Sequence, residues 1–217
     1  MNAGRYILSG GLAMKRSTIV LGMLAALLLT ANSARAQRFE LGLSVGALKS
    51  GDHNLPTTGT IRSDTGFAYE VNFAARLYNA HLAALYVEVP FAGTPNTGLT
   101  SSNPFSPSDY SSFFLTPGLK LKLLPIAPIS PYGFVGAGLA RFHSGSSLAN
   151  GQPNTGDQSA TRGAVDFGAG VDWKVLPFFS VRGEVRDFYS GTPRFNINVL
   201  GDKQHNVLVS GGVVFRF

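Results

Sequence analysis

The residues of this sequence that could do chemistry are carboxylates and cations placed at every second position. In residues 181–186, for example, arginine, glutamate and arginine alternate with valine and glycine. Alternate residues of a β-strand lie on one face, so these charges would share a face opposite an apolar one. Opposite charges held on one face can form ion pairs or line a path for ions. Fourteen charged residues fit this pattern: Glu40, Glu70, Arg76, Glu88, Lys120, Lys122, Arg162, Asp166, Asp172, Lys174, Arg182, Glu184, Arg186 and Arg216.

A second candidate for chemistry is the cluster of His143, Ser144 and Ser146. A hydrolase of the serine type needs a base within hydrogen-bond reach of the nucleophilic hydroxyl. The His-x-Ser spacing that would place both side chains on one face of a strand is missing at this point. A lipid A-modifying enzyme therefore stays an alternative, and the sequence itself assigns no catalytic residue.

The histidines offer a possible metal site, because His53, His143 and His205 all fall in or beside polar segments near Asp52 and Asp202. These ligands would come from separate loops, so we expect solvated histidines and no metal. The chain has no cysteine, which excludes a disulfide scaffold and a thiolate site. The Gly-x-Gly pairs at 136/138 and 168/170 are not followed by a helix, so they are not phosphate loops. No cofactor is expected.

The elements that must hold these residues are strands, because alternation of period two recurs about eight times. In the last of them Val207, Val209, Val213 and Phe215 share the apolar face. We expect one continuous fourth strand over 113–122. The fifth strand, 132–142, is ambiguous because both of its faces are apolar or glycine, and Val135, Ala137 and Leu139 are expected to face outward. The pattern predicts an all-β fold, an eight-stranded antiparallel up-and-down transmembrane β-barrel.

The connections between these strands alternate in length. Four of them are long and rich in Gly, Pro, Asn and Ser, and three are short. Outer-membrane barrels have long extracellular loops and short periplasmic turns, which would leave both termini of this chain in the periplasm. The long segments are 48–64, 92–109, 144–158 and 190–204, and the short ones are 78–80, 124–130 and 175–178.

Residues 1–36 read as a secretory signal peptide. Lys15 and Arg16 precede an apolar run, and Ala34-Arg35-Ala36 supplies the small residues of a cleavage site, so cleavage is expected after Ala36. Met14 is a candidate for the true start. Residues 37–217 would form the barrel domain. Removal of the four cations of 1–36 leaves 14 basic residues against 12 acidic ones, so the formal charge of +6 gives no support for nucleic-acid binding.

Over 39–217 the chain resembles the OmpA/OmpX-like, opacity-type family of outer-membrane β-barrel proteins. The resemblance is carried by 131–138 (PYGFVGAG), 167–173 (FGAGVDW), 180–186 (SVRGEVR) and 213–217 (VVFRF). It implies a bacterial outer-membrane location and a C-terminal signal, Phe215 and Phe217, that is read by the barrel-assembly machinery. The fold hosts adhesins, structural anchors, narrow channels and lipid-modifying enzymes, so the resemblance leaves the activity open.

Charges and barrel size together give the functional expectation. A barrel of eight strands is just wide enough to be filled by its own side chains, and charges buried there must pair. We therefore expect a salt-bridged plug, with a narrow ion-conducting pore as the alternative. The expected protein is a monomeric, non-enzymatic barrel that serves envelope integrity or surface interaction through its extracellular loops. Its expected partners are outer-membrane lipids, lipopolysaccharide and, during biogenesis, the assembly machinery.

Overall fold

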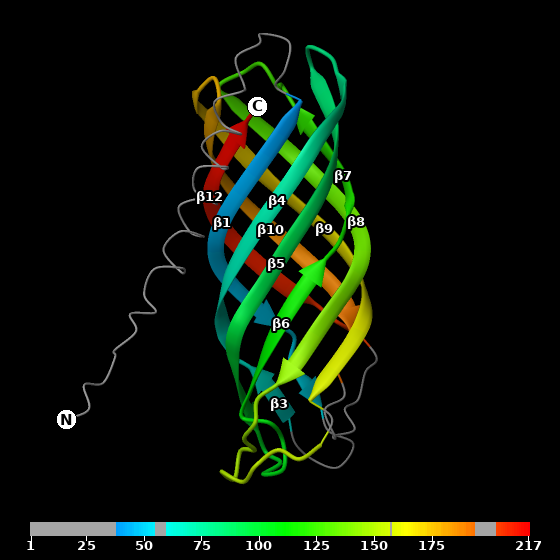
Figure 1. Cartoon of the computed structure of the whole chain (residues 1–217), viewed down its shortest axis with the longest axis vertical. Helices are drawn as coiled ribbons and strands as arrows, with labels where there is room; N and C mark the ends of the chain where they lie inside the picture. Colours follow the sequence, from blue (N-terminus) through cyan, green and yellow to red (C-terminus); the bar gives the residue numbers. More distant parts are fainter. Residues whose placement is uncertain (1–37, 55–59, 157, 194–202) are drawn as a thin grey trace, which may run out of the picture. The chain divides into compact units, whose positions relative to one another are not determined.

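The computed structural model describes residues 38–54, 60–156, 158–193 and 203–217. Within these ranges Arg38–Arg216 form one compact unit, a closed β-barrel (Figure 1). No helix in this part of the chain is long and apolar enough to cross a membrane. The expected signal peptide, 1–36, lies outside the described residues.

Eight antiparallel positions make up the barrel wall, and the wall closes where the first strand pairs with the last. Around the ring the order is β1, β4, β5, β6/β7, β8, β9, β10 and β12, where β6 and β7 share one position. Strand β12 then pairs with β1, with Leu43 opposite Val213. The strands of the wall are β1 (Phe39–Ser50), β4 (Thr65–Asn79), β5 (Ala83–Ser101), β6 (Asp109–Leu115), β7 (Gly118–Leu123), β8 (Ile129–Ser144), β9 (Ser159–Leu176), β10 (Phe179–Gly191) and β12 (Asn206–Arg216). The eight-stranded antiparallel barrel is confirmed.

The two faces of the wall follow the alternation in the sequence. In β8, whose faces the sequence left ambiguous, Val135, Ala137 and Leu139 point outward as expected. Tyr132 and Phe142, on the other face of β8, are buried in the lumen. Large apolar side chains cover the outside of the wall, as a surface in contact with lipid requires.

The expectation of one continuous fourth strand over 113–122 is wrong. Two strands, β6 and β7, occupy this position, and Thr116 and Pro117 separate them. Proline has no backbone N–H to donate to a neighbouring strand, so the ladder is interrupted here. At the break, the Thr116 hydroxyl donates to Asp166 inside the barrel at 2.8 Å.

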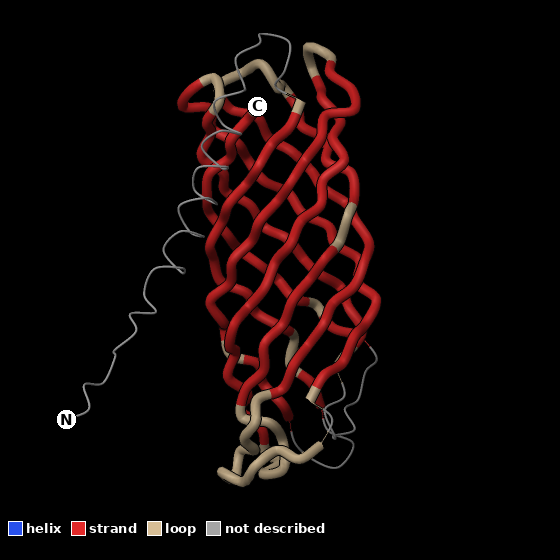
Figure 2. Tube along the Cα trace, viewed as in Figure 1, coloured by secondary structure: helices blue, strands red, loops and turns tan. Residues whose placement is uncertain are grey.

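The long segments contain more strand than the sequence suggested. Segment 48–64 includes β2 (His53–Asn54) and β3 (Thr60–Ser63), and β3 pairs with the far end of β5, where Ile61 faces Ser101. The segment 190–204 includes β11 (Lys203–Gln204), which pairs with β10. Strand β3 and the connection from β5 to β6 lie at the lower end of the barrel in Figure 1 and Figure 2, which we call the long-loop end. The opposite end, the short-turn end, carries the tight connections β4–β5, β7–β8 and β9–β10.

Closure of the barrel depends on a close approach at Gly212. A Cβ atom there would meet the Leu43 carbonyl and Ser44 of the adjacent strand at distances no side chain tolerates. We therefore expect Gly212→Ala to destabilise the barrel by about 1–3 kcal/mol, as overpacking does. Urea unfolding in lipid vesicles and the heat-dependent shift in gel mobility measure the effect.

The matched control is the neighbouring Gly211→Ala. Its Cβ would meet only the Arg182 carbonyl, at an ordinary contact distance, and would point away from the lumen. This variant should unfold like the wild type or slightly later. Equal stability of the two alanine variants would contradict the close-approach argument.

Candidate functional site in the lumen

The lumen is filled over much of its length by a network of ionisable side chains. Six carboxylates and five cations from seven strands take part, and all of them except Arg216 are buried. Each belongs to at least one ion pair with another member. We call this set the charge network: Glu40, Glu70, Glu88, Lys120, Lys122, Asp166, Asp172, Arg182, Glu184, Arg186 and Arg216.

Arg186 is the centre of one half of the network. Its guanidinium lies 2.9 Å from the Asp166 carboxylate, 3.0 Å from that of Glu70 and 3.4 Å from that of Glu184. It also donates to Glu88 from β5. A planar group with five donors can serve several carboxylates at once, which a lysine ammonium cannot do in the same plane. One arginine therefore ties together strands β4, β5, β9 and β10.

The other half of the network is built around Glu40 and Asp172. Glu40 accepts from Lys120 at 2.9 Å and from Lys122 at 2.5 Å. Asp172 receives two bonds from Arg182, Nε at 2.8 Å and Nη2 at 3.2 Å, which is the fork geometry of a strong pair. Glu88 joins the two halves, because it binds both Lys120 and Arg186.

Aromatic rings complete the surroundings of these cations. The Arg186 guanidinium carbon lies 4.2 Å from the centre of the Phe134 ring, and that of Arg182 lies 4.7 Å from the Tyr132 ring. The Tyr132 hydroxyl also donates to Glu184 at 2.6 Å. Ring faces attract cations, so these contacts add to the compensation that the carboxylates provide.

Three of the fourteen residues predicted for this site lie outside the ion pairs found among the described residues. Arg162 sits towards the long-loop end, where its Nε donates to the Thr192 carbonyl at 3.2 Å. Lys174 sits at the short-turn end and donates to the Pro125 and Ile126 carbonyls of the β7–β8 turn. Arg76 is half-buried and lies opposite Tyr86 in the pairing of β4 with β5. Strand parity placed them on the inner face, but parity does not say how far along the barrel a residue lies.

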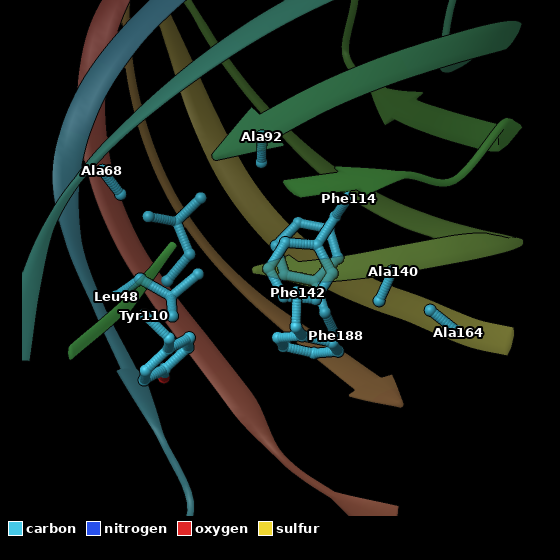
Figure 3. Close-up of a cluster of buried hydrophobic side chains, with 10 residues drawn as sticks. Leu48, Ala68, Ala92, Tyr110, Phe114, Ala140, Phe142, Ala164 and Phe188 are labelled. Atoms are coloured by element: carbon cyan, nitrogen blue, oxygen red, sulfur yellow. The ribbon is translucent and has the colours of Figure 1, made fainter. Parts of the chain in front are cut away.

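A second layer of the lumen is apolar, and the sequence analysis missed it. The rings of Phe114 and Phe188 stack with centroids 4.5 Å apart, and Phe142 meets Phe114 edge to face at 5.8 Å (Figure 3). Leu48, Leu208 and Tyr110 pack with them, and all are buried. We call this set the phenylalanine plug. The signal for it was the apolar inner face of β8, which made that strand ambiguous.

Beyond the plug, towards the long-loop end, the lumen is filled by hydroxyl and amide groups. Tyr110 donates to Ser50 at 2.7 Å, and Ser50 donates to Asn206 at 2.7 Å. Asn206 in turn donates to Ser190 at 3.0 Å. Charged, aromatic and neutral polar groups therefore follow one another along the lumen. Such a filling links the strands of the wall from within.

The candidate hydrolase residues do not come together. His143 is exposed on the outer face of β8, whereas Ser144 is buried in the lumen and accepts from Asn154 at 3.1 Å. Adjacent residues of a strand point to opposite faces, so these two side chains cannot form a base–nucleophile pair. Ser146 lies in the following loop and is exposed.

The candidate metal ligands are also apart within the described residues, which contain no group of three or more His, Cys, Asp or Glu suited to a metal. Asp202 lies outside the described part. His205 pairs instead with Asp187, with Nδ1 and Oδ2 2.6 Å apart. The sequence analysis did not single out Asp187, although it lies at the same alternate positions of β10 as the outward apolar residues.

Comparison with known proteins gives one family and several similar folds. The family model "Outer membrane protein beta-barrel domain" matches residues 19–217. No curated protein matches the chain. Among solved structures, Neisserial surface protein A is 18% identical, with a TM-score of 0.55, over 82% of this chain and 97% of its own.

Two further structures are similar in fold. OprG from Pseudomonas aeruginosa is 11% identical with a TM-score of 0.54, over 84% of this chain and 96% of its own. A major outer membrane protein from Thermus thermophilus is 13% identical with a TM-score of 0.50, over 82% of this chain and 99% of its own. At these identities the likeness concerns the fold alone.

The charge network predicts a large effect for the loss of its central cation. Arg186→Met leaves four buried carboxylates without their shared partner, and we expect it to destabilise the barrel by about 3–5 kcal/mol. Equilibrium urea unfolding in lipid vesicles measures the difference.

Arg162→Met is the control, because it makes the same change of side chain on the inner face but outside the ion pairs. It should cost about 1 kcal/mol or less, the value of one hydrogen bond. If both variants unfold at the same urea concentration as the wild type, the network does not hold the barrel together.

Proposed function

The chain belongs to the outer membrane protein β-barrel family, and we propose that it is a sealed, non-enzymatic barrel of the bacterial outer membrane. In this proposal it contributes to envelope integrity and presents its long-loop end for contact outside the cell. The observation that carries the proposal is the filling of the lumen by the charge network and the phenylalanine plug in series. Each of the two layers alone would obstruct an aqueous path.

Support for a sealed barrel comes from the chemistry of the two layers. An ion crossing the charge network would have to displace groups already paired at hydrogen-bond distance, such as Arg182 and Asp172. It would then meet Phe114, Phe142 and Phe188, which offer no ligand to replace its hydration shell. A narrow pore is therefore the less favoured function.

Support for surface contact comes from the bracing of two long loops against each other. Ser108 donates from its backbone to the Ser147 carbonyl at 3.0 Å, and Ala149 to that of Ser106 at 2.8 Å. On this braced pair Phe105 keeps 62% of its surface exposed. An exposed aromatic side chain on an ordered loop is typical of a contact surface. The Neisserial relative in fold is, by its name, also a surface protein.

The proposal includes a monomeric state, a C-terminal assembly signal and the absence of enzymatic activity. A wall that closes on itself through β1 and β12 needs no second copy, which supports a monomer. Phe215 and Phe217 are proposed as the signal read by the assembly machinery. The non-enzymatic assignment is supported by the opposite directions of His143 and Ser144 on β8.

Single-channel recording tests the sealed lumen. The refolded protein, inserted in planar lipid bilayers, should give no reproducible conductance steps, because the two filled layers leave no continuous water path. Insertion is checked by the heat-dependent gel shift of protein recovered from the same vesicles. Cells that lack the protein should also admit bulky antibiotics more readily, and the wild-type gene should restore the barrier.

Steps of constant size whose ion selectivity changes in Arg186→Met would contradict the proposal. They would show that the charge network lines a path.

A further inference from the structure

Four side chains form a polar ridge on the outer wall, where only apolar residues would be expected to meet lipid. Asp187 and Tyr189 belong to β10 and Lys203 belongs to β11, and His205 directly precedes β12. His205 binds Asp187 at 2.6 Å and packs on Tyr189 with ring centroids 4.8 Å apart. The Lys203 ammonium lies 5.3 Å from the centre of the Tyr189 ring. We call these four residues the outer ridge.

A groove lies on each side of the outer ridge. The larger one, about 470 Å³, has a floor of Ala47, Val207 and Val209, with Lys49, Asp52 and His205 among the polar residues at its edge. The smaller one, about 250 Å³, is floored by small residues that include Ala137 and Gly163, with Tyr189 and Lys203 at its edge. Each groove therefore combines an apolar floor with one lysine.

The position of the ridge places both grooves at the edge of the membrane. Towards the short-turn end the outward residues of the same strands are apolar, for example Val185, Val181 and Val209. Towards the long-loop end the polar loops begin. Rings with a polar tip are enriched where hydrocarbon meets headgroups, and the long-loop end of such barrels faces outside the cell. The grooves thus lie at the headgroup level of the outer leaflet.

The charges at the groove edges favour an anionic occupant. Lys49 donates one bond, to the Ser63 carbonyl at 3.1 Å, and an ammonium has two further donors. Each nearby carboxylate has one oxygen in a polar contact: Asp187 Oδ2 lies 2.6 Å from His205 Nδ1, and Asp52 Oδ1 accepts from the Ser63 amide at 3.3 Å. Two lysines on the two sides of one ridge suit a ligand with more than one anionic group.

We propose that the outer ridge and its two grooves bind the phosphorylated, multiply acylated glycolipid of the outer leaflet, lipid A. Its phosphates contact Lys49 and Lys203, and its acyl chains lie along the apolar floors on either side of Tyr189 and His205. The lipid headgroup is thereby fixed to the wall beside the β1–β12 closure. This site goes beyond the proposed function and uses only the outer wall, so its failure leaves the sealed lumen untouched.

Native mass spectrometry of the refolded full barrel in detergent, with purified diphosphorylated lipid A as the probe, tests the proposal. The double variant Lys49→Ala/Lys203→Ala should lower the bound fraction about tenfold, because charge-assisted contacts to phosphate are lost. The matched control is Arg141→Ala, which removes an outward cation at the same end of β8 that lines neither groove. It should bind within about twofold of the wild type.

A groove-filling variant gives an independent arm. A Cβ at Gly163 would meet no atom within 4 Å, so Gly163→Leu should fold with the normal heat-dependent gel shift while it blocks the smaller groove. It should bind lipid A several-fold more weakly. The proposal is overturned if the lysine variant binds as the wild type does or Arg141→Ala loses as much. Equal binding of phosphatidylglycerol would likewise overturn it, because the site would then bind anionic lipids without preference for lipid A.

Discussion

Burial of acidic and basic side chains inside a wall that faces lipid is the constraint on which the rest of this structure depends. A closed ring of eight strands has a lumen that its own side chains must fill, and here six carboxylates and five cations fill much of it. An uncompensated charge in such a place costs several kcal/mol, so each must lie against an opposite charge. Arg182 and Arg186 meet this demand because one guanidinium can serve several carboxylates from different strands.

The side chains that fill the lumen form layers along the barrel axis, and they differ from those of the outer wall. The phenylalanine plug and the hydroxyl layer occupy the part of the lumen nearer the long loops, so the polar groups of the network are shielded from that side. In the proposed function the inside serves stability, and interactions with other molecules are assigned to the loops and the outer wall. At the outer ridge a polar pair, His205 and Asp187, interrupts the apolar exterior.

The fold could be predicted from the sequence because a period of two assigns each strand residue to one face. This rule assigns Glu40, Glu184 and Arg186 to the inner face, and all three side chains are buried. It could not give height along the barrel, so it also placed Arg162 and Lys174 in a network that they do not join. Other features depended on contacts that no local pattern reports. The aromatic plug was hidden because both faces of β8 are apolar, and the break at Pro117 was missed because alternation continues through it.

The central claim is that the lumen charges stabilise the barrel through one another, and a double-mutant cycle on Arg182 and Asp172 tests it most directly. The free energy of unfolding in lipid vesicles is measured for the wild type, Arg182→Met, Asp172→Asn and the double variant. Mutual compensation predicts that the double variant is more stable than the sum of the two losses implies, by at least about 1.5 kcal/mol. Additive losses, within about 0.5 kcal/mol, would contradict the account.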